Sequence, residues 1–163
     1  MTLDDDVARL ARTRPFSLMP REALQLLAFS SEKKRLKAGD AVFEASERAD
    51  AGYFVLSGVI ALHAADGEVE RTRQVEAGGL VGETALIAEV ARPFSARAAA
   101  NAVVLRVPRE VFRRVLLEFP AAAVKIRQAY AARTRKFVAD LDASRVRALD
   151  RVARPGSEKR RAV

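Results

Sequence analysis

Glycine is concentrated in one part of this chain, and that distribution limits the folds open to it. Seven of the eight glycines lie between Gly39 and Gly82, where they recur at the junctions between short strand-like runs and turns. Because glycine adopts backbone conformations that other residues avoid, this spacing predicts turns between short strands. Many short strands at regular spacing are typical of a sandwich or a barrel. The candidate strands cover residues 33–37, 41–44, 52–56, 59–64, 70–76, 95–99 and 103–107.

Helical patterns flank these strands and interrupt them once. Residues 4–13 and 20–29 predict two helices before the strands, and residues 109–119 and 121–152 predict two after them. A short helix at 84–87 falls between two strands. We therefore expect an α+β fold: an antiparallel β-roll or jelly-roll barrel with a short inserted helix, flanked by N-terminal helices and two C-terminal helices. A hairpin turn is expected at Ala65-Asp66-Gly67.

The stretch from Gly78 to Ala96 breaks the strand pattern and carries groups that suit an anion. Glycines let backbone N–H groups approach a ligand closely, and the first turn of a helix at 84–87 would present further N–H groups. Arg92 adds a planar cation that fits phosphate. Glu83 would repel a free phosphate, but it can accept a hydrogen bond from a hydroxyl on the same ligand, such as a ribose 2′-OH. The stretch therefore indicates a sugar-phosphate site; an ordinary glycine-rich turn before a helix is the alternative.

Residues 82–87, with the sequence Gly-Glu-Thr-Ala-Leu-Ile, resemble the phosphate-binding cassette of cyclic nucleotide-binding domains. In that family Phe-Gly-Glu-x-Ala-Leu is followed, after a short spacer, by Arg-x-x-Thr/Ser. Here Arg92 comes nine positions after Glu83, and Ser95 comes three positions after Arg92. The resemblance covers about residues 18–120. It implies a β-roll that binds cAMP or cGMP without a metal, and the serine favours cAMP.

The resemblance assigns eight residues to the ligand. Arg92 would pair with the cyclic phosphate, and Glu83 would accept a hydrogen bond from the ribose 2′-OH. Gly82, Thr84 and Ala85 would line the sugar phosphate with backbone groups. The full set is Val81, Gly82, Glu83, Thr84, Ala85, Arg92, Ser95 and Ala96.

The resemblance also gives roles to the other three residues of the set, and two positions depart from the family pattern. Ser95 would reach the phosphate or the purine, while Val81 and Ala96 would border the base. Val81 stands where the family usually has Phe, which is a change in packing. Pro93 follows Arg92, where the family often has a small residue whose N–H contacts the phosphate. Proline has no N–H, so one phosphate donor is missing.

Charge is distributed unevenly along the chain. Residues 1–120 contain 17 basic and 17 acidic side chains, and residues 121–163 contain 12 basic and 4 acidic ones, so the last 43 residues hold the whole net charge of +8. We expect the ligand-binding domain at 1–120, a long basic helix at 121–152 and a disordered basic tail at 153–163. An apolar stripe on the helix would pack on the chain's own core, cover the ligand or form a dimer seam. The stripe consists of Tyr130, Phe137, Val138, Leu141, Ala148, Leu149 and Val152.

The composition excludes several kinds of chemistry. The chain has no cysteine, so disulfides, thiolate metal sites and cysteine catalysis are ruled out, and one histidine, His63, cannot form a zinc site. No apolar run approaches the ~18 residues of a membrane span, and residues 1–6 are acidic rather than apolar. We expect a cytoplasmic protein that is not an enzyme.

The leading hypothesis is a small signalling receptor for a 3′,5′-cyclic nucleotide, in which the helix at 121–152 closes over the base as the output. One alternative is a degenerate cassette that has lost its ligand and acts as a protein-interaction module, which Pro93 favours. Another is a nucleic-acid or anionic-surface binder that uses the basic residues after 120. An unknown protein partner or a second copy of the chain would receive the signal, and sequence-specific DNA binding is not expected.

Overall fold

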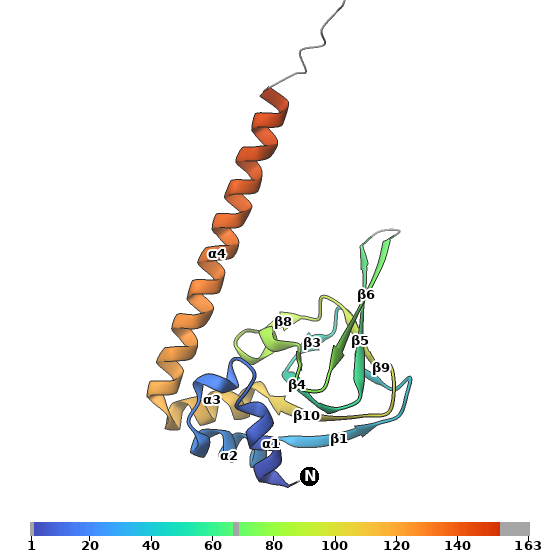
Figure 1. Ribbon diagram of the computed structural model, residues 1–163, viewed down its shortest axis with the longest axis vertical. Coiled ribbons are helices and arrows are strands. Elements are labelled where there is room, and N and C mark those ends of the chain that lie inside the picture. The colour runs from blue at the N-terminus through green and yellow to red at the C-terminus, as the bar shows by residue number, and fades with distance from the viewer. Residues whose placement is uncertain (1, 67–68, 154–163) are drawn as a thin grey trace, which may run out of the picture. The chain divides into compact units, whose positions relative to one another are not determined.

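The computed structural model describes the backbone of residues 2–66 and 69–153, and the side chains of residues 2–64 and 70–133 with a few beyond (Figure 1). The chain divides into two compact units, Met1–Ala123 and Val124–Val163. The first unit contains all the strands that the structure describes. The second unit continues the last helix. It carries the whole apolar stripe and the tail, and of these only the side chain of Tyr130 lies within the described residues.

Helices precede and follow the strands, as the sequence predicts. They are α1 (Leu3–Leu10), α2 (Arg21–Ser30), α3 (Arg109–Glu118) and α4 (Pro120–Ala153), with 3₁₀ turns η1 (Phe16–Leu18) and η2 (Glu83–Leu86). The inserted helix expected at 84–87 is therefore a 3₁₀ turn that begins one residue earlier. Thr2 caps α1 in a reciprocal pair of hydrogen bonds with Asp5, and Asp4, Asp5 and Asp6 lie in the first turn of this helix.

Ten strands form open antiparallel sheets within the described residues. Their bounds are β1 (Glu32–Leu36), β2 (Ala41–Phe43), β3 (Arg48–Ala49), β4 (Ala51–Ser57), β5 (Val59–Asp66), β6 (Val69–Glu76), β7 (Leu80–Val81), β8 (Val90–Ala91), β9 (Ser95–Ala98) and β10 (Ala102–Pro108). One sheet has the order β1-β10-β4-β7, the second has the order β2-β9-β5-β6, and β3 pairs with β8. The expected β-roll is confirmed, although its sheets do not close into a barrel.

All seven strands expected from the sequence are present, with ends within two residues of the predicted bounds. Three two-residue strands, β3, β7 and β8, were not predicted, because pieces this short carry no alternation of apolar and polar residues. β5 and β6 pair from Val59 with Glu76 to Asp66 with Val69, so the expected hairpin is present. Asp66 belongs to the strand rather than to the turn, and residues 67–68 lie outside the described part.

The inner faces of the two four-stranded sheets enclose the main core. Strand β4 is buried along almost its whole length because its two faces contact different layers. Alternate residues such as Tyr53 and Val55 point into the core between the sheets, where they pack with Ile60 and Val104. The core fixes the positions of β5, β6 and β7, and these strands form the walls of the site described below.

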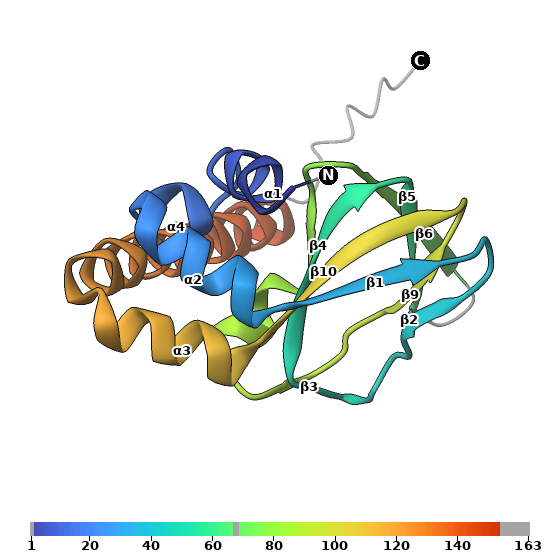
Figure 2. The same ribbon diagram turned by 90° about the horizontal axis from the view of Figure 1, so that it is seen from below.

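A helical layer covers the other face of β4. Phe54 points into this layer, where the ring of Phe16 lies edge-on to it at 6.2 Å between centroids and also meets Phe112 of α3 at 6.2 Å. Helices α1, α2 and α3 lie together on one side of the strands (Figure 2). Leu24 and Leu27 lie on the buried face of α2, whereas Phe29 is 79% exposed.

Candidate functional site

The turn that follows β7 requires glycine at one position for two reasons. Gly82 has a φ of +73°, in the left-handed region that side-chain-bearing residues seldom adopt. A Cβ atom at this position would also collide with Nη1 of Arg92. The sequence therefore brings an arginine guanidinium directly against the backbone of the turn. The next residues form η2, in which Ala85 and Leu86 are buried and hold the turn against β4.

Arg92 is a buried cation. Its side chain is 5% exposed, and its Nη2 donates a hydrogen bond of 2.8 Å to the carbonyl oxygen of Ala51. Its guanidinium carbon lies 4.0 Å from the ring centroid of Phe43 and 5.7 Å from that of Tyr53, so aromatic faces provide part of its solvation. Burial lowers the pKa of Arg92 from its ordinary value because removal from water disfavours the charged form.

The backbone on both sides of Arg92 is fixed as well. Its N–H donates to the carbonyl oxygen of Glu47 at 2.7 Å, and its own carbonyl oxygen accepts from the N–H of Ser46 at 2.8 Å. Among the described residues, no carboxylate forms an ion pair with Arg92. A desolvated cation held in one position without a carboxylate partner is suited to binding an anion.

A cavity of about 300 Å³ lies beside this cation, within the size range of small-molecule sites. The walls come from β5, β6, β7 and the segment that carries Arg92. Apolar side chains of Leu62, Val75, Leu80 and Phe94 form part of the lining. Of the eight residues predicted to contact a ligand, six line the cavity: Val81, Gly82, Glu83, Thr84, Ala85 and Arg92.

Two predicted site residues do not line the cavity. Oγ of Ser95 accepts a hydrogen bond of 2.9 Å from the N–H of Ala45, which ties β9 to the neighbouring loop. Ala96 is fully buried in the core between the sheets and pairs with Leu62. The roles assigned to Ser95 and Ala96 therefore stay predictions.

Arg73 and Pro93 also line the cavity, although neither belongs to the predicted set. Arg73 on β6 presents an exposed cation, and Pro93 is the unusual residue next to Arg92. Period-two alternation would have placed Arg73 on the same face as Val75. The sequence does not single out Arg73, because the strand contains charged residues on both faces.

No group of three histidine, aspartate or glutamate side chains that could hold a metal ion occurs in the part of the chain that the structure describes. None of the helices described is long and apolar enough to span a membrane.

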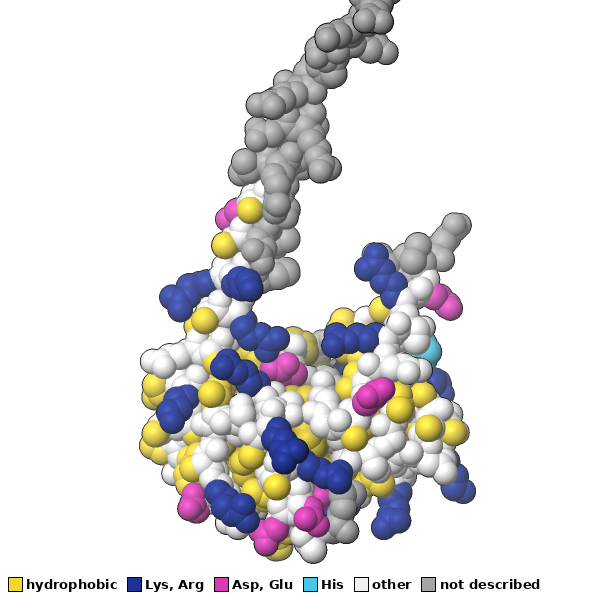
Figure 3. Space-filling model, in the orientation of Figure 1, with side chains coloured by type: hydrophobic (Ala, Val, Ile, Leu, Met, Phe, Trp, Pro, Cys, Tyr) yellow, Lys and Arg dark blue, Asp and Glu magenta, His cyan; other side chains and the backbone are white. Residues whose placement is uncertain are grey.

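Basic and acidic side chains are interspersed over the face of the first unit that Figure 3 shows, as its balanced charge predicts.

A family model described as "Cyclic nucleotide-binding domain" matches residues 33–119. A solved structure of a cyclic nucleotide-binding-like protein from Brucella abortus is 38% identical to this chain, with a TM-score of 0.64, over 69% of this chain and 98% of that one. The N-terminal domain of a transcriptional regulator from Streptomyces coelicolor is 25% identical, with a TM-score of 0.73, over 79% of this chain and 94% of that one.

A curated relative is much longer than this chain. Lysophospholipase NTE1 from Phaeosphaeria nodorum is 32% identical over 126 residues, which is 76% of this chain. The same match spans only 8% of the length of the lysophospholipase. This chain therefore corresponds to one small part of that protein.

Proposed function

We propose, since this chain belongs to the cyclic nucleotide-binding domain family, that its cavity binds a 3′,5′-cyclic nucleotide and that the chain acts as a regulatory domain. The observation that carries this proposal is the burial of the Arg92 side chain beside the cavity. Burial without an ion pair to a described carboxylate costs free energy, and a phosphate anion in the adjacent cavity would offset that cost. The cyclic phosphate bears one negative charge, which matches the single positive charge of Arg92.

The residues around Glu83 would recognise the sugar. Gly82 places the backbone within reach of Arg92, so one ligand group can contact both the guanidinium and the turn. Backbone groups of Thr84 and Ala85 would line the sugar phosphate. Glu83 lies on the cavity wall, where its carboxylate would accept a hydrogen bond from the ribose 2′-OH.

The apolar part of the lining would hold the base. Leu62, Val75 and Val81 offer flat aliphatic contact to a purine. We propose cAMP as the preferred ligand over cGMP, on the basis of a serine at position 95.

The activity proposed here is regulation without catalysis. Domains of this fold typically regulate, and the cavity offers a cation, a carboxylate and backbone groups for binding. The ligand would shift an equilibrium between two arrangements of the chain, with helix α4 as the element that closes and carries the signal. In the lysophospholipase relative, a domain similar to this one forms part of an enzyme, so a regulatory role beside a catalytic domain is consistent with that similarity.

A panel of thermal melts tests this proposal. A ligand present at 100 times its Kd raises the free energy of unfolding by about 2.7 kcal/mol. We expect cAMP and, at higher concentration, cGMP to raise the melting temperature, whereas 5′-AMP and adenosine leave it unchanged. Equal stabilisation by 5′-AMP, or no stabilisation by either cyclic nucleotide at millimolar concentration, would contradict the proposal.

The second candidate function is that of a protein-interaction module without a ligand. Pro93 favours it, because this residue lines the cavity and lacks the N–H that would bind phosphate. A flat response to every nucleotide in the melting panel is the outcome that this alternative predicts.

A further inference from the structure

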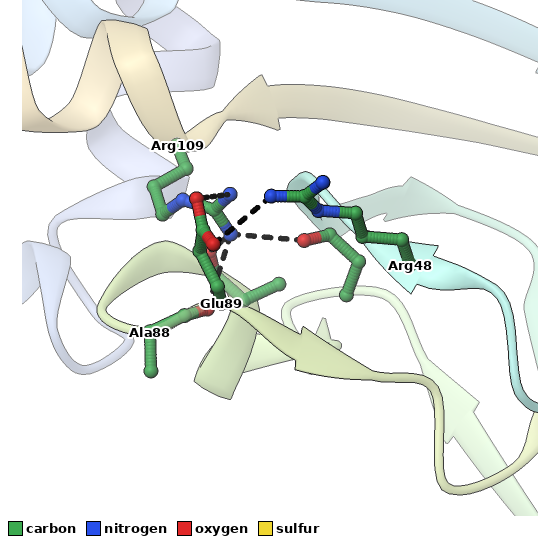
Figure 4. Close-up of polar contacts among 6 residues, drawn as sticks. Arg48, Ala88, Glu89 and Arg109 are labelled. Carbon is green, nitrogen blue, oxygen red and sulfur yellow. Dashed lines mark hydrogen bonds and ion pairs between the residues drawn. The ribbon is translucent and has the colours of Figure 1, made fainter.

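Arg109, the first residue of α3, joins that helix to the carbonyl end of η2. Its Nη1 donates to the carbonyl oxygens of Ala85 at 3.1 Å, Ala88 at 3.1 Å and Ala49 at 2.9 Å. Its Nη2 lies 3.7 Å from Oε1 of Glu89. Figure 4 shows the guanidinium of Arg109 close to the carboxylate of Glu89 and to Ala88.

The carbonyl acceptors are concentrated around one guanidinium that is largely shielded from water. The side chain of Arg109 is 13% exposed. The last carbonyl groups of a helical turn carry partial negative charge, and a guanidinium placed against them is stabilised electrostatically. The backbone N–H of Arg109 also donates to the carbonyl oxygen of Asp50 at 2.8 Å. One residue thus fixes both the start of α3 and the end of η2.

The two ends of η2 contact two different arginines. Gly82 precedes the turn and lies against Arg92 at the cavity, while the carbonyl oxygens of Ala85 and Ala88 accept from Arg109, which does not line the cavity. The turn is only four residues long, so a displacement at its first residue moves its last. The buried side chains of Ala85 and Leu86 leave it little freedom to deform internally.

We propose that Arg109 is a positioning residue that couples the nucleotide cavity to α3. It holds η2 in the orientation that the ligand requires, and it transmits to α3 any shift of η2 that the ligand causes. This coupling rests on the proposed function, because it requires that a nucleotide binds at the other end of the turn. Arg109 itself is not among the residues that line the cavity, so it would not touch the ligand.

Hydrogen exchange of the full chain, with and without cAMP, tests the coupling. In the wild type, cAMP should slow exchange in peptides covering 82–88 and in peptides covering α3. In Arg109→Met, 82–88 should still respond, the response of α3 should be lost, and affinity should fall about tenfold. The matched control is Arg48→Met, which removes an exposed ion pair of 2.9 Å to the same Glu89 but no carbonyl contact. This control should keep the wild-type response.

Two outcomes overturn the coupling while the proposed function stands. One is a wild-type response of α3 in Arg109→Met, and the other is an equal loss of that response in Arg48→Met. If Arg109→Met does not fold, Arg109→Lys keeps the charge but cannot reproduce the planar group; a full α3 response in that variant also overturns the coupling. Absence of cAMP binding to the wild type is a separate result, and it overturns the proposed function and this inference together.

Discussion

Arg92 illustrates a conflict between stability and function at the scale of one residue. The fold surrounds this cation with Phe43, Tyr53 and the Ala51 carbonyl oxygen, but no ion pair with a described carboxylate compensates its burial. Such an arrangement costs free energy in the empty protein and makes a bound anion more favourable. A neutral side chain of similar length would pack in the same space, but it would remove the charge that attracts the ligand.

Glu83 should discriminate between a ribose and a deoxyribose. Because its carboxylate would accept from the 2′-OH, Glu83→Gln should weaken cAMP binding by about 1.5–3 kcal/mol, the range for a hydrogen bond to a charged group. The change should have little effect on 2′-deoxy-cAMP, which lacks that hydroxyl. Titration of cAMP and 2′-deoxy-cAMP into the wild type and into Glu83→Gln measures the interaction energy between the carboxylate and the hydroxyl. If the two ligands lose equal binding free energy, Glu83 does not recognise the ribose hydroxyl.

Pro93 should limit affinity. Replacing it by alanine restores a backbone N–H beside Arg92, at the cavity wall. One added donor to a charged phosphate should tighten binding about tenfold, equivalent to about 1.4 kcal/mol. The control is Pro20→Ala at the start of α2, far along the chain from the cavity residues, which should leave the Kd unchanged. Unaltered affinity in Pro93→Ala would show that the missing N–H donor does not limit the affinity for the nucleotide.

At the scale of elements, turns set the register of the β-roll. Gly58, between β4 and β5, has a φ of +82°, and a Cβ there would lie 2.6 Å from Cα of Ala102. Gly39 has a φ of +91°, but a Cβ there would meet nothing within 4 Å. Gly58→Ala should therefore lower the free energy of unfolding by roughly 3 kcal/mol, and Gly39→Ala by about 1–2 kcal/mol. Denaturant unfolding measures both; equal losses would mean that backbone strain alone decides the cost.

The elements that the sequence predicted are those with a repeating pattern. The predicted helices and strands, all longer than two residues, follow the period of 3.6 or 2 that burial of one face imposes, and they were found within a few residues of their expected bounds. The strands β3, β7 and β8 and the 3₁₀ character of η2 depend on contacts with distant segments. The interaction of Arg109 with Ala85 and Ala88 is of the same kind, because residues 24 and 21 positions apart meet only after the sheets assemble.

The candidate site was predictable where its residues are close in sequence. Residues 81–85 and Arg92 lie on one loop, and the structure brings them to one cavity. The contribution of Leu62, Arg73 and Val75 depends on how β5 and β6 pack over that loop, which no local pattern specifies. Ser95 matches the family motif in sequence, yet its hydroxyl hydrogen-bonds to the backbone of Ala45 in this structure.

At the scale of the whole molecule, charge and structure divide the chain in similar places. The basic excess begins after residue 120, and the compact unit that holds the cavity is Met1–Ala123. This division supports the proposal that ligand recognition belongs to the first unit and that output belongs to α4 and the residues beyond. It also places the proposed coupling through Arg109 within the first unit, on the path from the cavity to the helices that follow the strands.

Calorimetric titration of the wild type and of Arg92→Met with cAMP and cGMP tests the central claim most directly. Arg97→Met is the matched control, because Arg97 forms an exposed ion pair of 2.7 Å with Glu44 and does not line the cavity. We predict that the wild type and Arg97→Met bind cAMP alike, and that Arg92→Met loses about 2–5 kcal/mol of binding free energy. Wild-type affinity in Arg92→Met would contradict the account, because the buried cation would then not be the phosphate site.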